Sequence, residues 1–386
     1  MPPRFLLYNY WISPYKTIIL GVVKAVSALF IQKLPGRFAA ENKTNRFMSS
    51  KPIITGLMAY GMSGRIFHAP FLVTNPGFTF RAVVERHEKK AGKRYPDVIS
   101  YNSIEGLLSD EEIELIIVNT PNNTHFDYAV RALNAGKHVL IEKPAAVTSA
   151  EVKTLFDLGK KLGLKVMIYQ NRRYDSGFLS VKKVIESGRL GELIEVHFRL
   201  DRYRMPIGPK VFKETKDTPG NGLTYDLGAH LVDNAISLFG KPLSFVKTTA
   251  THRPGSQVDD YFNFHLTYPN QLHVYLTSGL LIAEHLPGFV IHGTLGSFVK
   301  LRTDVQEAQL DEGMMPTDDG FGIEPEGSDG KLVLMGPDNQ KTIEWVPSDK
   351  GDYNGLFDAV YHTVRDNALF PITEEHIAWQ IELLES

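Results

Sequence analysis

Short runs of β-branched residues alternate with helical stretches from residue 51 to residue 171, and this rhythm constrains the fold more than any other feature. The predicted strands are Pro52–Leu57, Phe80–Glu85, Leu115–Asn119, His138–Ile141 and Lys165–Tyr169. The clearest helix between them is Thr124–Ala135, whose apolar residues recur at helical spacing before Gly136 ends it. Strand–helix–strand repetition is typical of a parallel sheet covered by helices on both faces. The sequence therefore predicts a doubly wound α/β domain.

The pattern changes after Asn171, where longer strands alternate between apolar and polar residues. The predicted strands are Leu193–Arg204, Tyr261–Tyr268, His273–Gly279, Phe289–Ile291, Phe298–Leu301, Leu332–Met335 and Thr342–Val346. Turns rich in Pro, Gly and Asn separate them, which predicts a large open, mainly antiparallel sheet. The acidic, Gly- and Pro-rich stretch Asp311–Asp329 is interpreted as a mobile loop. We expect domains over 51–171 and 172–350, with helices of 351–386 packing back.

Residues 1–47 differ from the rest of the chain. They hold two apolar stretches interrupted by Lys16 and Lys24, and neither reaches the ~20 apolar residues of a membrane span. A mis-assigned start before Met48, a targeting or anchoring segment and a structural extension all remain open. We expect a cytoplasmic protein whose folded domains do not contact a membrane.

The overall charge and the missing cysteines exclude several classes of function. Lys and Arg number 42 against 44 Asp and Glu, a net charge of −2, which argues against a basic nucleic-acid binder. The chain has no cysteine, so disulfide scaffolds, Cys-ligated zinc and thiol nucleophiles are excluded.

A dinucleotide-binding turn follows the first predicted strand. Gly61 and Gly64 meet the needs of close backbone approach to a pyrophosphate and of close helix packing. Ala59 stands where the first glycine of the pattern usually lies, and it fits only with a negative φ. The expected cofactor-binding residues here are Ala59, Gly61, Met62, Ser63, Gly64 and Arg65.

The end of the second predicted strand bears on the choice of cofactor. Glu85 stands where an acidic residue binds the ribose hydroxyls of NAD, while Arg86 is able to pair with the 2′-phosphate of NADP. The sequence slightly favours NAD, because a carboxylate repels a phosphate.

Glu142, Lys143 and Pro144 lie at the carboxyl end of a predicted strand, where open α/β sheets bind ligands. A lysine there, beside an apolar cofactor face, suits proton transfer. The alternative is a surface lysine that extends into solvent.

A polar stripe marks a later helix. Asp226, His230, Asp233 and Ser237 share one face at about 3.6 residues per turn, and the rest is mostly apolar. The stripe faces either bulk solvent or a cleft, in which case Asp226 orients His230 for proton exchange near pH 7. No intact three-ligand set is evident, so we expect no metal.

Five segments together resemble the Gfo/Idh/MocA oxidoreductases, and within them the branch that contains NADP-dependent scyllo-inositol dehydrogenases. They are Gly61–Phe71, Thr120–His125, Glu142–Pro144, Asn171–Asp175 and Asp226–His230. The resemblance implies an N-terminal Rossmann domain plus a C-terminal α/β domain with a large open, mainly antiparallel sheet. It also implies a homodimer or homotetramer formed through that sheet.

The resemblance implies roles for residues that match the family's motifs. Lys143, Asp226 and His230 match its catalytic Lys, Asp and His. The residues expected beside the nicotinamide ribose are Thr120, Pro121, Asn122 and His125, and Glu142 is expected against the cofactor. Two residues depart from the pattern: Ala59 replaces a glycine, and Glu85 stands where NADP-using relatives often have a small polar residue.

We therefore expect an NAD(P)-dependent oxidoreductase that transfers hydride between nicotinamide and a secondary alcohol carbon of a polyol or sugar-like substrate. In this hypothesis His230 is the general base, Asp226 orients it and Lys143 stabilises the alkoxide; the roles of Lys143 and His230 are interchangeable at this point. The alternative is a non-catalytic NAD(P)-binding sensor of the same fold.

The expected substrate-binding residues are Arg172, Arg173, Tyr174 and Asp175, which follow the last Rossmann strand and offer hydrogen bonds to a polyol. The alternative is that Arg173 and Asp175 pair with each other at the domain junction.

Overall fold

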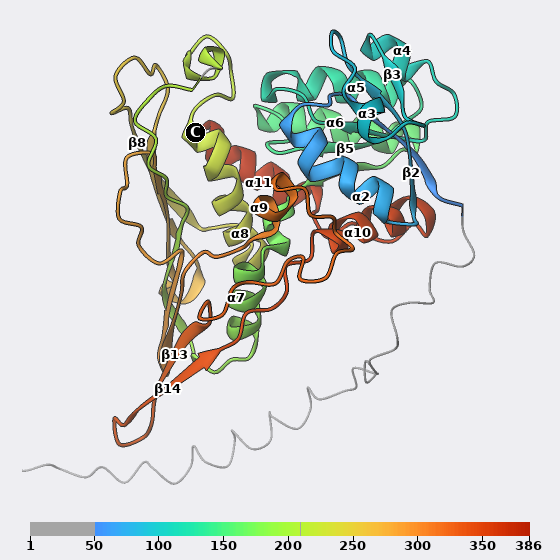
Figure 1. The fold of residues 1–386 in the computed structure, drawn as a ribbon. Coiled ribbons are helices and arrows are strands. Elements are labelled where there is room, and N and C mark those ends of the chain that lie inside the picture. The colour runs from blue at the N-terminus through green and yellow to red at the C-terminus, as the bar shows by residue number, and fades with distance from the viewer. Residues whose placement is uncertain (1–50, 209) are drawn as a thin grey trace, which may run out of the picture. The chain divides into compact units, whose positions relative to one another are not determined.

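The computed structural model describes residues 51–208 and 210–386, so the interpretations of residues 1–47 lie outside the described residues. Six parallel strands form sheet A in the order β3-β2-β1-β4-β5-β6 (Figure 1). They are β1 (Ile53–Leu57), β2 (Phe78–Val84), β3 (Ile99–Tyr101), β4 (Leu115–Val118), β5 (His138–Glu142) and β6 (Val166–Tyr169). This is the doubly wound order of dinucleotide-binding folds, and it confirms the predicted parallel sheet.

Helices connect these strands. They are α2 (Ala69–Thr74), α3 (Ala91–Arg94), α4 (Ile104–Leu108), α5 (His125–Asn134) and α6 (Ser149–Leu162). Strand β4 is fully buried at every residue, which explains its uninterrupted Leu-Ile-Ile-Val sequence. Helix α6 begins with a capping box between Thr148 and Glu151 and ends at Gly163, which has a φ of 69°.

Eight strands form sheet B in the order β14-β13-β12-β11-β7-β10-β9-β8. They are β7 (Leu193–Arg199), β8 (Ser244–Ala250), β9 (Tyr261–Thr267), β10 (His273–Gly279), β11 (Phe289–Gly293), β12 (Gly296–Lys300), β13 (Gly330–Met335) and β14 (Lys341–Val346). Only β7 and β10 pair in parallel within this described sheet, so the predicted antiparallel character is confirmed. The sequence missed the edge strands β3, which has three residues, and β8, whose sequence Ser-Phe-Val-Lys-Thr-Thr-Ala does not alternate between apolar and polar residues.

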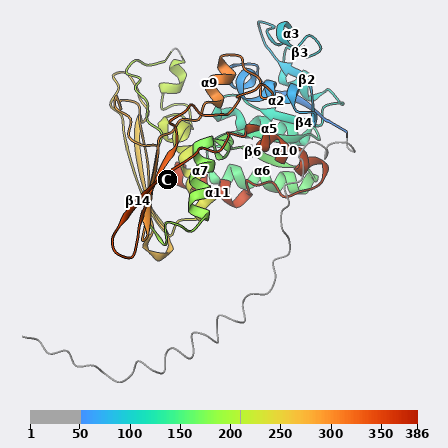
Figure 2. The ribbon, with the colours of Figure 1, turned by 60° about the horizontal axis from the view of Figure 1, so that its bottom comes forward.

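The remaining helices lie mostly between the two sheets (Figure 2). They are α7 (Ser176–Glu186), α8 (Ala229–Phe239), α9 (Gln306–Asp311), α10 (Tyr353–Arg365) and α11 (Glu374–Glu385), with two π-helical turns, η2 (Gly64–His68) and η6 (Thr224–Gly228). Short 3-10 turns are η3 (Asn122–Thr124), η4 (Asn171–Tyr174), η5 (Val211–Glu214) and η7 (Pro269–Gln271). Among the described helices none is long and apolar enough to cross a bilayer.

The C-terminal helices join the two sheets. Helix α11 packs against both α6 and α8, and the Gln380 side chain donates to the Ala229 carbonyl oxygen (2.6 Å) and accepts from Gln170 (3.0 Å). On α10, the ring of Phe357 stacks on Phe71, with 4.9 Å between centroids. These contacts fix the beginning of α8 relative to the carboxyl ends of sheet A.

The acidic stretch 311–329 does not behave as the mobile loop that the sequence predicted. Phe321 is buried and lies edge-on to Phe71, and the Glu324 carboxylate lies 2.8 Å from the Nζ atom of fully buried Lys300. The apolar and ionic partners come from distant parts of the chain, so local composition did not reveal them.

Candidate functional site

The turn after β1 is held by Asn119, which follows β4. Its Oδ1 atom accepts from the Ala59 N–H (3.0 Å), and its Nδ2 atom donates to the Ala59 carbonyl oxygen (2.8 Å). The φ of Ala59 is not positive, which meets the steric condition that the sequence set for alanine at this position.

The two glycines of the turn have different surroundings. A Cβ atom added at Gly64 would lie 2.3 Å from the Ala59 carbonyl oxygen, so no side chain fits between helix and strand. A Cβ atom added at Gly61 would meet nothing within 4 Å, so this backbone faces open space. The first amides of the following helix have no intrahelical acceptor, so the turn is a cradle that fits a dinucleotide pyrophosphate.

Glu142, at the end of β5, is joined to the same helix. Its Oε1 atom accepts from the Ser63 hydroxyl (2.9 Å) and lies 2.8 Å from Nε2 of His68. Burial alone would raise the pKa of Glu142, but the hydrogen bond from His68 and the Lys143 ammonium hold it below its ordinary value. The carboxylate thus ties the cradle to the strand that carries Lys143.

The loop after β4 is held by His125. Its Nδ1 atom lies 2.7 Å from the Pro144 carbonyl oxygen, and its Nε2 atom lies 2.8 Å from the Thr120 carbonyl oxygen. Burial lowers the pKa of His125. The Asn122 side chain reaches across to donate to the Gly220 carbonyl oxygen (3.0 Å), so this loop also contacts the second domain.

Lys143 lies across the cleft from Asp226. Its Nζ atom donates to the Asp226 carbonyl oxygen (2.7 Å) and to Oδ1 of the same residue (3.0 Å). The peptide bond between Lys143 and Pro144 is cis. Burial would raise the pKa of Asp226, but Lys143 and Arg202 hold it well below its ordinary value. The two domains therefore meet at an ammonium–carboxylate pair.

The structure differs from the expected Asp226–His230 contact. Asp226 lies in the π turn η6, while His230 lies in the first turn of α8. A π turn contains more residues than an α turn, so it rotates Asp226 away from the face that the predicted spacing gave it. The carboxylate consequently faces Lys143, and π turns occur at both the cradle and this site.

His230 is buried and surrounded by cations. The residue lies on α8 and is only 6% exposed. Its Nδ1 atom has no hydrogen-bond partner among the described residues. Burial, the Lys143 ammonium and the Arg172 guanidinium hold the pKa of His230 well below its ordinary value. The imidazole is therefore neutral near pH 7. Of the predicted polar stripe, His230 and Asp233 are buried and Ser237 is partly buried, whereas the Asp226 side chain is exposed beside Lys143.

The four expected substrate-binding residues all make contacts within the protein. The Arg173 guanidinium forms a two-pronged pair with Asp233 (2.7 and 2.8 Å). The Arg172 guanidinium lies 3.2 Å from Asp175 and 2.8 Å from Glu307.

Asp175 accepts from the Tyr353 hydroxyl (2.9 Å), and the Tyr174 carbonyl oxygen accepts from the Asp352 amide (2.9 Å). Arg173 and Asp175 thus have separate partners, and these contacts connect domains rather than line the cavity described below.

Glu85 is turned into the protein. Its carboxylate accepts from the Lys90 amide (2.7 Å), the Ala91 amide (3.2 Å) and the Ser100 hydroxyl (2.6 Å), and the residue is only 7% exposed. Arg86 beside it is exposed. This geometry weighs against Glu85 as a partner for ribose hydroxyls, because both carboxylate oxygens already hold the β2–α3 loop.

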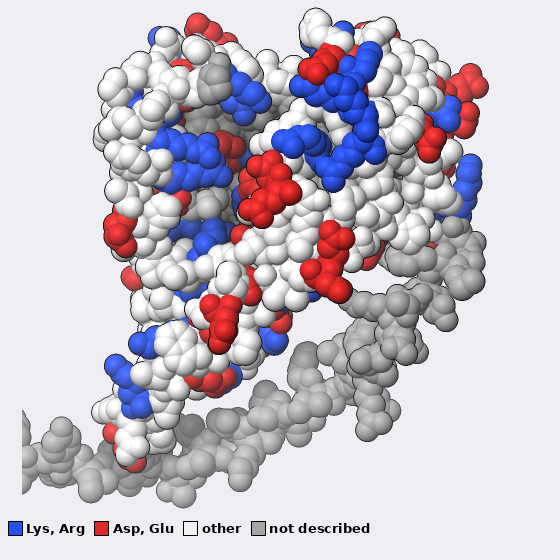
Figure 3. Space-filling view, viewed as in Figure 1, with Lys and Arg blue, Asp and Glu red and all other residues white. Residues whose placement is uncertain are grey.

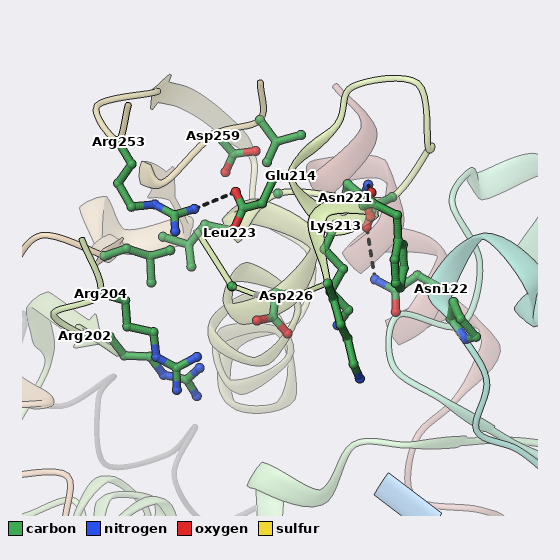
Figure 4. Close-up of a pocket in the computed structure, with 18 of the residues that line it drawn as sticks. Asn122, Arg202, Arg204, Lys213, Glu214, Asn221, Leu223, Asp226, Arg253 and Asp259 are labelled. Atoms are coloured by element: carbon green, nitrogen blue, oxygen red, sulfur yellow. Dashed lines mark hydrogen bonds and ion pairs between the residues drawn. The ribbon is translucent and has the colours of Figure 1, made fainter. Parts of the chain in front are cut away.

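A cavity of about 370 Å³ opens beside Asp226 (Figure 4). The loop after β4 contributes Pro121, Asn122 and Asn123 to its wall, the π turn η6 contributes Asp226, and most of the remaining wall comes from the segments that follow β7 and β8. Several cationic side chains line it, namely Arg202, Arg204, Lys210, Lys213 and Arg253. The cavity lies next to the Lys143–Asp226 pair, where a substrate would meet these groups.

Sequence reasoning named Pro121, Asn122 and Asp226 of this cavity but missed its cationic residues. Arg202 and Arg204 are two apart within a predicted strand, a spacing that places them on one face, and this signal was available. Asn119, which holds the turn after β1, and His68, which contacts Glu142, stand in no sequence pattern that would have marked them. In residues 51–208 and 210–386, no three His, Asp or Glu side chains gather as a metal site would require.

Two family models, one for each domain of the same family, match the chain. The model of an oxidoreductase family with an NAD-binding Rossmann fold, GFO/IDH/MocA, matches residues 54–170. The model of the GFO/IDH/MocA C-terminal domain matches residues 178–299.

Similar proteins and structures cover nearly the same length. An oxidoreductase of Schizosaccharomyces pombe is 38% identical over 87% of this chain and 96% of its own. The scyllo-inositol 2-dehydrogenase (NADP(+)) IolW of Bacillus subtilis is 31% identical over 86% of this chain and 92% of its own. The crystal structure of an oxidoreductase from Bacteroides fragilis is 39% identical, with a TM-score of 0.78 over 87% of this chain and 96% of that one.

Proposed function

The chain belongs to the GFO/IDH/MocA family of oxidoreductases with an NAD-binding Rossmann fold, and on that premise we propose that it transfers hydride between a nicotinamide cofactor and a secondary alcohol carbon of a polyol or sugar-like substrate. The observation that carries this proposal is the ion pair between Lys143 and Asp226 at the edge of a cavity that Asp226 lines, with the buried imidazole of His230 close enough for the Lys143 ammonium to lower its pKa. The name of the Bacillus subtilis relative, an inositol dehydrogenase, supports the substrate class.

The nicotinamide ring, when bound, accepts or supplies the hydride. Gly61 and the helix that follows it would hold the pyrophosphate, because the backbone there is open, and the loop from Thr120 to His125, which His125 braces, would hold the nicotinamide ribose. Glu142 keeps these parts together through Ser63 and His68.

His230 removes the proton of the substrate hydroxyl. It is suited to this role because it is neutral and because its Nδ1 atom has no competing partner among the described residues. The cations around it also stabilise an alkoxide oxygen that forms nearby.

Lys143 donates a hydrogen bond to the same oxygen. Its Nζ atom is held by the side chain and carbonyl oxygen of Asp226, so Asp226 acts by orienting Lys143 rather than His230. This geometry favours Lys143 as the oxyanion-stabilising group over the reversed assignment, in which the lysine is the base.

The cofactor of this proposal is NADP. The slight sequence preference for NAD depended on a Glu85 carboxylate that repels a 2′-phosphate, and that carboxylate is turned inward and already accepts three hydrogen bonds. Arg86 is exposed at the end of the same strand and is able to pair with the phosphate. The relative IolW carries NADP(+) in its name.

The outer face of sheet B supports assembly into a homodimer or homotetramer. Strand pairing aligns one row of side chains across the sheet: Val246, His265, Tyr275, His197, Val290, Val299, Lys331 and Trp345. The rings of His265, Tyr275 and His197 stack in sequence, with centroids 4.6 and 4.8 Å apart. Val246 and Trp345 are 63% and 60% exposed, and exposed aliphatic and aromatic side chains gathered on one sheet face, as in this row, are typical of an interface.

One experiment tests the proposed function against the sensor alternative. The purified protein is supplied with NADP+ and a panel of inositols, alditols and sugars, and reduced nicotinamide is followed by its absorbance. We expect turnover of at least one secondary alcohol and its loss in Lys143→Met. Tight NADP binding with no turnover across the panel would favour the sensor.

A further inference from the structure

Two arginines point into the cavity from one extended segment. The chain beyond β7 remains extended because the Arg202 amide donates to the Gly279 carbonyl oxygen (3.0 Å) and the Arg204 amide donates to the Leu280 carbonyl oxygen (2.7 Å). Residues two apart in an extended segment project to the same side. Figure 4 shows the two side chains together, on the wall opposite Lys213.

The carboxylates that line this cavity already have partners. Asp226 lies 3.0 Å from the Lys143 ammonium, and Glu214 lies 2.7 Å from the Arg253 guanidinium. Asp259 accepts from the amide (2.7 Å) and hydroxyl (2.8 Å) of Thr224. Asp226 and Glu214 are thus each paired with a cation, whereas the partners of Asp259 are neutral groups, so Asp259 is the one carboxylate among these three without an ion pair.

Four cationic side chains of the cavity, Arg202, Arg204, Lys210 and Lys213, form no ion pair and no hydrogen bond in the described part of the chain, and they outnumber the one carboxylate without an ion pair. Burial lowers the pKa of Arg202 and of Lys213, although Asp226 acts in the opposite direction. Figure 3 shows lysine and arginine atoms gathered around the hollow between the Rossmann domain and sheet B.

A cavity with excess positive charge and walls of low polarity attracts and binds anions. An arginine guanidinium matches the planar geometry of a carboxylate or phosphate and donates two parallel hydrogen bonds. Neither Gly61 nor Ser63 lines this cavity, so the cradle for the cofactor's pyrophosphate lies elsewhere. The unpaired positive charge of the cavity is therefore available to bind an anionic group of the substrate.

We propose that the substrate of this enzyme carries an acidic group, a carboxylate or a phosphate, which Arg202 and Arg204 bind together with Lys213. Its alcohol carbon then faces Lys143 and His230. This inference rests on the proposed function and narrows its substrate class from neutral polyols to acidic ones. Arg202 and Arg204 determine specificity, and they take no part in proton transfer.

The test uses the full chain saturated with NADPH and three probes that share one carbon skeleton: sorbitol, gluconate and sorbitol 6-phosphate. Binding is measured by calorimetry and by the fluorescence of the bound cofactor. We expect at least one acidic probe to bind about tenfold or more tightly than sorbitol, and the tighter of the two acids identifies carboxylate or phosphate. Each hydrogen bond to a charged group contributes about 1.5–3 kcal/mol, which is roughly a 10- to 100-fold change in affinity.

The variants Arg202→Gln and Arg204→Gln should each lower the ratio of acidic to neutral affinity by roughly 10- to 100-fold. Arg204→Lys should restore part of it, because a lysine keeps the charge but not the fork. Arg189→Gln is the matched control, since Arg189 pairs with exposed Glu344 and does not line the cavity. Raising the salt concentration should weaken the binding of acids more than that of sorbitol.

Equal affinity of sorbitol and both acids would overturn the inference, and so would an unchanged affinity ratio in both arginine variants. A different result would contradict the proposed function. Turnover of neutral polyols with no preference for acids keeps the hydride-transfer proposal and removes the anion site. Binding of acids without any turnover supports the anion site and contradicts the hydride-transfer proposal.

Discussion

The Nζ atom of Lys143 lies 3.0 Å from Oδ1 of Asp226, and the two residues come from different domains. Lys143 follows the last residue of β5 in the Rossmann sheet, and Asp226 belongs to the π turn that precedes α8. The ion pair thus places the end of the parallel sheet against the helix that carries His230. Of these three groups Asp226 lines the adjoining cavity, and the Lys143 ammonium is bonded to it.

Replacing Lys143 with Met should lower turnover by roughly 100- to 10,000-fold, because the alkoxide loses its hydrogen-bond donor. The dissociation constant of NADP should change little. Steady-state kinetics and cofactor titration measure the two quantities. Lys161→Met is a matched control, because Lys161 is exposed on α6. Unchanged turnover in Lys143→Met would remove this residue from the catalytic set.

The two glycines of the cradle should respond differently to alanine. Gly64→Ala places a Cβ atom 2.3 Å from the Ala59 carbonyl oxygen, so the free energy of unfolding should fall by about 1–3 kcal/mol. Gly61→Ala meets no protein atom within 4 Å, so its stability should be normal while its affinity for NADP falls more than about tenfold. Thermal unfolding and fluorescence titration separate the effects. Equal losses of stability would contradict this division of roles.

Arg86→Gln should reverse the cofactor preference. The guanidinium is expected to pair with the 2′-phosphate, so kcat/KM for NADP should fall by roughly 10- to 100-fold while that for NAD stays near its original value. Initial rates with each cofactor give the ratio, and Arg189→Gln again serves as the control. A parallel decrease with both cofactors would mean that Arg86 contacts the adenine or ribose instead.

The pH dependence of oxidation should reflect His230. Its pKa is held well below the ordinary value of 6.5, so the imidazole stays neutral as the pH falls from 8 through about 6.5 and becomes protonated only at lower pH. The guanidinium groups of Arg172, Arg202 and Arg302 remain charged throughout this range. We therefore expect kcat/KM to decline only below about pH 6.5, and His230→Gln to lack this acidic limb. A decline centred above pH 7 would contradict a neutral, cation-surrounded base.

The outer face of sheet B should hold the oligomer together. Tyr275→Arg introduces a charge between the stacked rings of His265 and His197 and should shift the protein toward the monomer. Light scattering after gel filtration measures the mass, and thermal unfolding shows whether the monomer is still folded. Lys182→Glu on α7 is the control for a change of surface charge. A stable variant of unchanged mass would exclude this face as the interface.

Much of the fold followed from local pattern. The fully buried Leu115–Val118 strand and the helix beginning near His125 both carry their structure in the spacing of their apolar residues. Strand β8 escaped detection because its sequence does not alternate between apolar and polar residues, whereas the equally exposed edge strand β14 retains that alternation and was predicted. The stretch 311–329 was misjudged because its order depends on Phe71 and Lys300, which are distant in sequence.

The sequence by itself determined the two domain classes and the motifs, because the periodicity of apolar residues and the types of reactive side chain are local properties of the chain. The tertiary structure alone decided which groups meet. In the folded chain a π turn brings Asp226 to Lys143, and Arg173 pairs with Asp233. Glu85 is turned into the protein, and Arg202 and Arg204 line the cavity without an ion pair. Charge pairing depends on distances of a few ångströms between segments that are far apart in the chain, and no local pattern contains those distances.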